Sequence, residues 1–103
     1  MEPDTLRQLV RLRDQFLNEG FEILGYFGSR ARDDYSGDSD LDILYRLHDP
    51  FYAKNPGWEA VGRIEEIRVA ISKALELEID LANRDSLNRV SEKYILGETV
   101  YVA

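Results

Sequence analysis

Hydrophobic and polar residues follow two different periods along this chain, and the period changes from one segment to the next. Apolar residues recur every three or four positions over 4–18 and 58–75, which predicts two amphipathic helices. Aromatic and branched residues dominate 21–27, while apolar and polar residues alternate through 40–47 and 77–82, which predicts three strands. Helices and strands therefore alternate along the chain, as in a small α/β domain.

Turn and cap signals complete the order of elements. Two of the three prolines fall in 48–57, which is expected to be a loop. Asp85 or Ser86 is expected to cap a last helix that stops at Gly97, and a short strand is expected at 101–102. This order predicts an α/β (α+β) fold in which a small mixed sheet is packed with helices.

Length and composition place the chain among ordinary folded proteins. Its 103 residues suffice for one domain, with 44% hydrophobic and 32% charged residues. Cysteine is absent, which excludes disulfides, zinc–thiolate sites and thiol nucleophiles. No apolar run is long enough to span a membrane, and acidic residues open the chain, so we expect a cytoplasmic protein without a signal peptide or membrane contact.

Charge narrows the range of partners. The chain carries 13 basic and 20 acidic residues, a formal net charge of −7. Direct binding to nucleic acid is not expected, because neutralising phosphates requires clustered Lys and Arg. Binding of a nucleotide through a divalent cation is compatible with this charge.

Three aspartates need an explanation, because they lie on strands that are otherwise apolar. Asp40 and Asp42 share one face of 40–47, and Asp80 lies on 77–82. Neighbouring carboxylates repel one another, and burial strengthens the repulsion, so a compensating cation is expected. Mg²⁺ prefers oxygen ligands of this kind. The alternative is that the three are edge-strand or solvent-facing aspartates.

The dipeptide Gly28-Ser29 follows directly on the predicted strand 21–27. A glycine there lets the backbone approach a ligand, and the N–H groups of a following helical turn can bind an anion together with the serine hydroxyl. Alone, such a dipeptide is usually only a turn. Combined with Asp40 and Asp42 on the next strand, it predicts a phosphate cradle that faces a metal site.

Gly28-Ser29, followed after ten residues by Asp40-Leu41-Asp42, resembles the defining motif of the DNA polymerase β-like nucleotidyltransferase superfamily. The local sequence is similar to the minimal nucleotidyltransferase (MNT) family in Phe27-Gly28-Ser29-Arg30-Ala31-Arg32 and Ser39-Asp40-Leu41-Asp42-Ile43. The resemblance covers nearly the whole chain, including Asp80 and the end Gly97-Glu98-Thr99-Val100-Tyr101. It implies a nucleotidyltransferase (polymerase β-like) fold and a single minimal domain over 1–103.

The resemblance also implies a reaction. Many MNT proteins are antitoxins encoded beside a HEPN-domain ribonuclease toxin, and their implied activity transfers AMP from ATP to a tyrosine of that toxin. In this chain, Asp40, Asp42 and Asp80 would bind Mg²⁺, as two ions, and form the catalytic centre. Gly28 and Ser29 would hold the triphosphate of ATP.

Two arginines lie within the same motif. Arg30 and Arg32 are nucleotide-binding candidates on the resemblance, and the other interpretation of both is a solvated charge cluster with the neighbouring Asp33 and Asp34. Asp33 is also a departure, because relatives often have glycine there. This departure leaves the shape of the following loop open.

An AMP-transferring antitoxin would act in a hetero-oligomer with its toxin, whose surface would complete the cleft. Phe51 and Tyr52 in the predicted loop are candidates for that contact, whereas Trp58 fits the apolar face of its helix and is expected in the core. Two other functions stay open: an antitoxin that neutralises by binding alone, and a nucleotidyltransferase that modifies a small molecule. The three aspartates favour the enzyme over the first, and the lack of a second helical domain disfavours the second.

Overall fold

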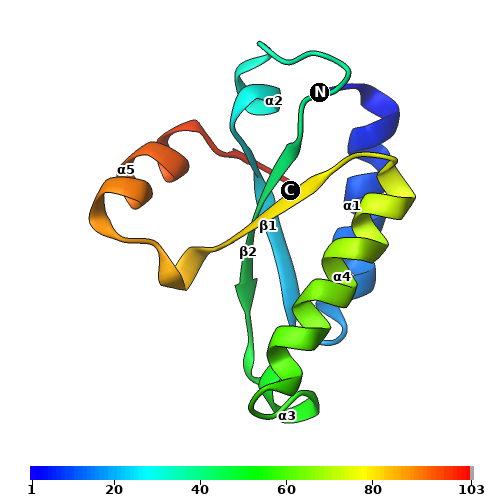
Figure 1. The fold of residues 1–103 in the computed structure, drawn as a ribbon, viewed down its shortest axis with the longest axis vertical. Helices are drawn as coiled ribbons and strands as arrows, with labels where there is room; N and C mark the ends of the chain where they lie inside the picture. The colour runs from blue at the N-terminus through cyan, green and yellow to red at the C-terminus, as the bar shows by residue number, and fades with distance from the viewer. Residues whose placement is uncertain (103) are drawn as a thin grey trace.

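The computed structural model describes residues 1–102 and contains one four-stranded sheet (Figure 1). Its strands are β1 (Phe21–Phe27), β2 (Leu41–Leu47), β3 (Ile79–Asn83) and β4 (Val100–Tyr101), in the order β3-β2-β1-β4. β1 is antiparallel to both of its neighbours, while β2 and β3 run parallel. The predicted mixed sheet is therefore confirmed, and so, within one residue, is the short terminal strand.

Helices lie on both sides of this sheet (Figure 1). α1 (Pro3–Leu17) and α4 (Glu59–Leu75) pack against each other and against one face, and α5 (Arg89–Glu98) lies on the opposite side. The shorter elements are α2 (Ser29–Arg32), α3 (Asp49–Lys54) and the 3₁₀ turn η1 (Arg84–Ser86). No helix within residues 1–102 has the length and apolar character that a membrane crossing requires.

The core lies between the sheet and the α1–α4 pair. Each helix buries one stripe of side chains at three- and four-residue spacing: Leu9, Leu12 and Phe16 on α1, and Ile67, Ile71 and Leu75 on α4. Alternate residues of β2 join this layer, namely Leu41, Ile43 and Tyr45. The same period of two leaves Asp42 on the opposite side of the sheet, where the charge of Glu98, the last residue of α5, lies near it.

Two expectations about aromatic residues are wrong. The predicted loop 48–57 contains α3, which has a proline in its first turn, where the missing N–H costs no helical hydrogen bond. Phe51 is fully buried on α3, with its ring centroid 6.3 Å from that of Phe21, so it belongs to the core and offers no partner contact. Trp58, expected in the core, is 89% exposed because it precedes α4 as its N-cap, beyond the turns that contact the sheet. Tyr52 is exposed, as a contact candidate should be.

The last helix starts later than expected. Asp85 and Ser86 lie in η1, and Asn88 caps α5 by accepting a hydrogen bond from a first-turn N–H at 2.8 Å. Gly97 lies inside the helix, which ends at Glu98. Because asparagine, aspartate and serine cap helices almost equally well, residue type alone did not distinguish the true start from its neighbours.

Candidate functional site

The ends of three strands bring the aspartates and the glycine turn to one place on the sheet. The β1–β2 ladder pairs Phe27 with Asp42, and the β2–β3 ladder pairs Asp42 with Asp80. Gly28 follows directly on Phe27, and Asp40 directly precedes β2. Because β1 runs antiparallel to β2, the end of β1 and the start of β2 lie together. The expectation that the strand of Asp40 and Asp42 neighbours the strand of Asp80 is therefore confirmed.

The three carboxylates repel one another. Asp42 is half-buried, while Asp40 and Asp80 are exposed. The pKa of Asp42 is raised from 3.8 to about 6, first because burial disfavours its charged form and then because the charges of Asp80 and Asp40 lie near. A hydrogen bond with Asp80 and the charge of Glu98 raise this pKa further. Among the described residues, no ion pair neutralises any of the three aspartates.

This donor set fits a divalent cation in its chemistry. Carboxylate oxygens are the ligands that Mg²⁺ prefers, and a cation would relieve the repulsion around Asp42. Within 1–102, no three acidic or histidine side chains converge closely enough to hold a metal ion as they stand. Asp42 and Asp80 are nevertheless ladder partners whose side chains share a hydrogen bond, and the charge of Asp40 lies near them.

The turn after β1 lies directly against Asp42. Gly28 has a φ of +77°, a conformation that glycine favours, and a Cβ atom there would stand 2.2 Å from Oδ2 of Asp42. Only glycine fits between this backbone and the carboxylate. Ser29 is half-buried and begins α2 beside it. The turn thus presents backbone N–H groups and a hydroxyl next to the carboxylates.

Arg30 points into the protein. It is 4% exposed, and its Nε and Nη2 atoms donate to the carbonyl oxygen of Ser39 at 3.1 and 2.9 Å. Its guanidinium also lies 4.6 Å from the ring centroid of Tyr35. The interpretation of Arg30 as a solvated charge is wrong, because its side chain ties α2 to the backbone immediately before Asp40.

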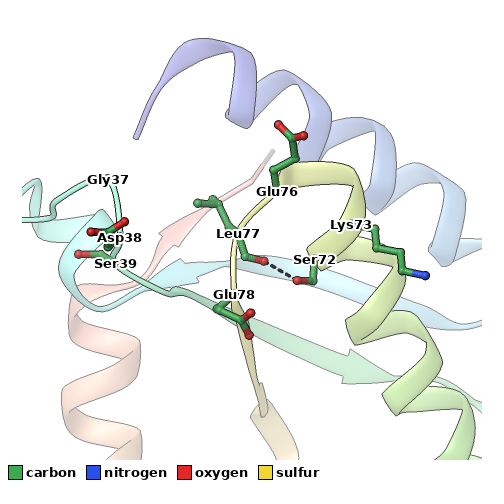
Figure 2. A pocket seen from close by; sticks show the side chains of 8 residues that line it. All are labelled: Gly37, Asp38, Ser39, Ser72, Lys73, Glu76, Leu77 and Glu78. Atoms are coloured by element: carbon green, nitrogen blue, oxygen red, sulfur yellow. Dashed lines mark hydrogen bonds between the residues drawn. The ribbon is translucent and has the colours of Figure 1, made fainter.

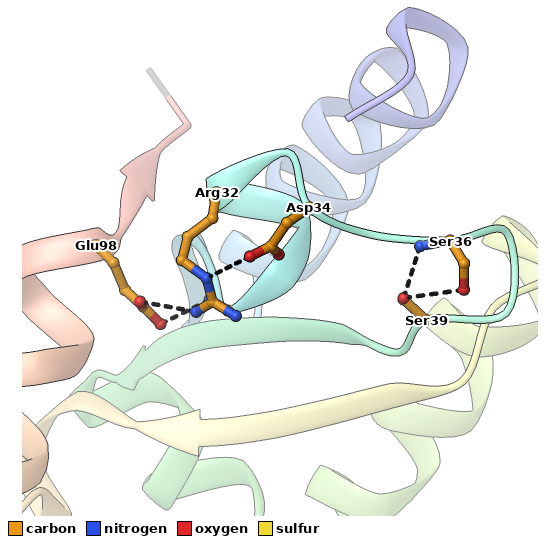
Figure 3. A network of polar contacts seen from close by, with 6 residues as sticks. Arg32, Asp34, Ser36, Ser39 and Glu98 are labelled. Atoms are coloured by element: carbon orange, nitrogen blue, oxygen red, sulfur yellow. Dashed lines mark hydrogen bonds and ion pairs between the residues drawn. The ribbon is translucent and has the colours of Figure 1, made fainter.

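Arg32 is exposed and connects two acidic residues (Figure 3). Its Nε donates to Oδ2 of Asp34 at 3.2 Å, and its Nη1 donates to Oε2 of Glu98 at 3.0 Å. The other oxygen of Glu98 accepts the Gly28 N–H at 2.9 Å. Sequence reasoning gave Glu98 no role, because this contact spans 70 positions and no local pattern indicates it.

Asp33 has a backbone conformation that glycine favours, at the position where the family resemblance led us to expect glycine. It ends α2 in the left-handed conformation, with a φ of +62°, where glycine carries no steric penalty. Aspartate tolerates this region better than most residues with a side chain. The loop therefore turns at the position where relatives often have glycine.

A separate pocket of about 450 Å³ lies between residues 37–39 and the turn from α4 to β3 (Figure 2). Three of its lining residues are acidic, Asp38, Glu76 and Glu78, and Lys73 is the single basic one. This charge balance disfavours a triphosphate. None of the seven predicted site residues lines this pocket, so the candidate site is the carboxylate cluster and the Gly28 turn instead.

A strand, a glycine turn, an aspartate-bearing strand and a third carboxylate thus lie together at one end of the sheet. The sequence profile described as "Nucleotidyltransferase domain" matches residues 11–102, so the chain belongs to this family. The predicted enzyme class is therefore confirmed, together with the family resemblance that rested on the Gly28-Ser29 and Asp40-Leu41-Asp42 motif.

Individual relatives agree with this assignment. "Putative protein adenylyltransferase MJ0126" of Methanocaldococcus jannaschii is 25% identical over 100 residues, 94% of each chain. A solved "putative minimal nucleotidyltransferase" has a TM-score of 0.70 and 23% identity, covering 97% of this chain and 95% of that one. The tri-AMPylated Shewanella oneidensis HEPN toxin in complex with MNT antitoxin contains a chain with a TM-score of 0.67 and 16% identity, covering 100% and 72%. The two structures share the fold, which confirms the predicted nucleotidyltransferase fold.

Proposed function

We propose that this chain transfers AMP from ATP to a hydroxyl group, that of a tyrosine, on a partner HEPN ribonuclease toxin and so acts as its antitoxin. The observation that carries the proposal is the ladder pairing of Asp42 with Asp80 beside the Gly28 turn. The name of the M. jannaschii relative supports an adenylyl group and a protein acceptor. The AMPylated HEPN toxin of the S. oneidensis complex supports the choice of partner.

Asp40, Asp42 and Asp80 are the residues that would hold Mg²⁺, as two ions. Bound there, Mg²⁺ neutralises the triphosphate and lowers the pKa of the attacking hydroxyl. The raised pKa of Asp42 supports this role, because a crowded carboxylate is stabilised by a cation. No histidine base is needed: His48, the one histidine of the chain, binds Glu22 before α3, at the other end of β2.

The β1–α2 turn would bind the triphosphate. Gly28 brings its backbone against Asp42, so a phosphate held there would lie next to the metal ligands. Ser29 offers its hydroxyl and backbone N–H, and the exposed Arg32 offers a planar guanidinium that can bind two phosphate oxygens.

Arg30 has a different part in this site. It is a positioning residue, because its two hydrogen bonds to the carbonyl of Ser39 hold the backbone that leads into Asp40. Its guanidinium cannot leave this buried position without losing both bonds, which makes Arg32 the better phosphate ligand of the pair.

The reaction is an in-line displacement at the α-phosphorus of ATP. The acceptor oxygen forms a bond to that phosphorus, and the bond from phosphorus to the oxygen bridging to the β-phosphate breaks. Pyrophosphate leaves with the electron pair, and the proton of the hydroxyl passes to Asp80 or to water. Positioning and charge neutralisation supply most of the acceleration in such transfers.

The acceptor must reach the site from outside. Exposure of Asp40 and Asp80 leaves this approach open to a side chain on another protein. The net charge of −7 favours docking onto a basic surface, such as that of an enzyme that cleaves RNA. The working form would be a hetero-oligomer in the cytoplasm, where ATP and Mg²⁺ are supplied.

The test is the intact mass of the neighbouring gene's product after incubation with this chain, ATP and Mg²⁺. A mass gain in whole AMP units supports the proposal if Asp40→Asn abolishes it and Asp38→Asn retains it. Asp38 is a matched control, because it is an exposed aspartate of the preceding loop. A stable complex without a mass gain would indicate neutralisation by binding alone. If the product showed no mass gain and formed no complex with this chain, the antitoxin assignment would be contradicted.

A further inference from the structure

The last residue of α5 reaches the turn after β1 from the far end of the sequence. Oε1 of Glu98 accepts the Gly28 N–H at 2.9 Å. Oε2 of Glu98 accepts a hydrogen bond from Nη1 of Arg32 at 3.0 Å (Figure 3). Each carboxylate oxygen of Glu98 therefore accepts one hydrogen bond. The side chain of Glu98 is 30% exposed, so this bridge is partly shielded from water.

The two donors are of the kind that a phosphate group uses. A backbone N–H at the start of a helical turn and a guanidinium both bind anionic oxygens, and both bonds are strengthened by charge. A carboxylate and a phosphate present similar oxygen acceptors to these donors. Glu98 thus makes the contacts that the triphosphate would make at Gly28 and Arg32.

The helix that carries Glu98 has few contacts that are shielded from water. None of the residues of α5 is buried, whereas α4 on the other side of the sheet buries Ile67, Ile71 and Leu75. Besides Glu98, one ion pair reaches α5 from outside the helix, between Arg84 and Glu92 at 3.6 Å, among residues 1–102. Two residues after Glu98, β4 pairs with β1, so the C-terminal end of α5 is anchored to the sheet. Release of Gly28 and Arg32 therefore requires the partly exposed side chain of Glu98 to rotate away, while the helix end stays in place.

We propose that Glu98 is an internal competitor of the nucleotide: its carboxylate occupies Gly28 and Arg32 in the free protein, and ATP must displace it. This inference rests on the proposed function and concerns the regulation of the same site. It makes nucleotide affinity depend on the side chain of Glu98, because its rotation away from the turn frees both donors. The opposite arrangement, in which Glu98 stays and helps to bind the metal, predicts effects of the opposite sign.

The test uses isothermal titration calorimetry to measure binding of α,β-methylene ATP in the presence of Mg²⁺. The bond from the α-phosphorus to the β-phosphate cannot be cleaved in this analogue. Glu98→Gln keeps an acceptor for the Gly28 N–H and removes the charge that holds Arg32. We expect its Kd to fall about tenfold, equivalent to about 1.4 kcal/mol, since a charged hydrogen bond no longer competes. Glu59→Gln removes the same charge from an exposed position on α4 that takes part in no ion pair among the described residues, and its Kd should stay within about twofold of the wild type.

A second measurement uses the unaltered chain. Hydrogen exchange of the α5 amides should become faster when the nucleotide analogue binds, because the helix loses its tether to Gly28. Unchanged or weaker binding by Glu98→Gln, or slower exchange in α5, would overturn the inference while the proposed function stands. If neither the wild type nor Glu98→Gln bound the nucleotide, the proposed function would fail, and the inference with it.

Discussion

The two faces of β2 show how one strand serves stability and chemistry at once. Leu41, Ile43 and Tyr45 are buried in the core layer with α1 and α4. Asp42, between the first two in sequence, lies on the other side of the strand, near the charge of Glu98 at the end of α5. Because side chains alternate across a strand, the backbone that the core holds rigid also fixes the position of the carboxylate. Substitutions one position apart should therefore have opposite consequences for stability and activity.

The helices on the two faces of the sheet differ in the same way, one supporting the core and the other lying beside the carboxylates. α4 buries a stripe of apolar side chains against the sheet, and α5 buries none. One face is thus a close-packed core, and the other carries charged groups beside a helix that has no buried residue. This contrast leads to four predictions, from the largest expected effect to the smallest.

Asp42→Asn should remove AMP transfer almost completely while the fold is kept. If Asp42 holds the metal as proposed, its loss would remove several kcal/mol of transition-state stabilisation, so we expect a decrease of about a thousandfold. The rate of AMP incorporation and the far-UV circular dichroism spectrum measure the two effects separately. Transfer at the wild-type rate by a folded variant would exclude Asp42 from the metal site.

Ile43→Ala, at the next position, should act on stability instead. Ile43 is fully buried, and truncation of such a side chain typically costs about 2–5 kcal/mol. Urea unfolding of the variant and of the wild type measures this loss. A cost below about 1 kcal/mol would mean that the α1–α4 face is not the packed core described above.

Stability of the metal-free protein should depend on pH through Asp42. Its pKa is about 6 in the folded chain against 3.8 ordinarily, so between these values the folded state binds more protons than the unfolded state. Stability therefore falls as the pH rises through this window, by about 1 kcal/mol once screening of this half-exposed group is allowed for.

The measurement compares urea midpoints at pH 5 and pH 7.5 in EDTA. Asp42→Asn should lack this part of the decline and should be the more stable protein at pH 7.5. Equal pH dependence in both proteins would show that Asp42 is not crowded by its neighbours.

Ser29→Ala should have the smallest effect of the four. Removal of one hydroxyl from the phosphate turn should weaken binding of Mg²⁺ and ATP about two- to fivefold, with less than about 0.5 kcal/mol of change in stability. Calorimetric titration and urea unfolding provide the two numbers. If the loss in free energy of unfolding were as large as the loss in binding free energy, the role of Ser29 would be to stabilise α2.

The parts that were predictable from sequence are those with a local signal. Alternation on 40–47 and 77–82 indicated the strands, and the spacing from Gly28 to Asp42 indicated the family. The parallel pairing of β2 and β3 then placed Asp80 opposite Asp42. A regular period of apolar residues indicates which positions of a helix or strand are buried, and for this reason these elements could be predicted.

The parts that were missed depend on contacts between distant segments. Phe51 is buried because Phe21 lies beside it, and Trp58 is exposed because no element covers the start of α4. The buried position of Arg30 depends on the carbonyl of Ser39, and the contact of Glu98 with Gly28 joins residues 70 positions apart. Side-chain type alone does not determine any of these environments.

The central claim is that the carboxylate face of β2 and β3 binds the metal and the nucleotide together. A crystal structure with Mn²⁺ and α,β-methylene ATP tests it most directly, because Mn²⁺ replaces Mg²⁺ and scatters anomalously. We predict anomalous density between Asp40, Asp42 and Asp80, with the triphosphate against Gly28 and Ser29. Density for the nucleotide in the pocket beside residues 37–39, or no metal at the aspartates, would contradict this account.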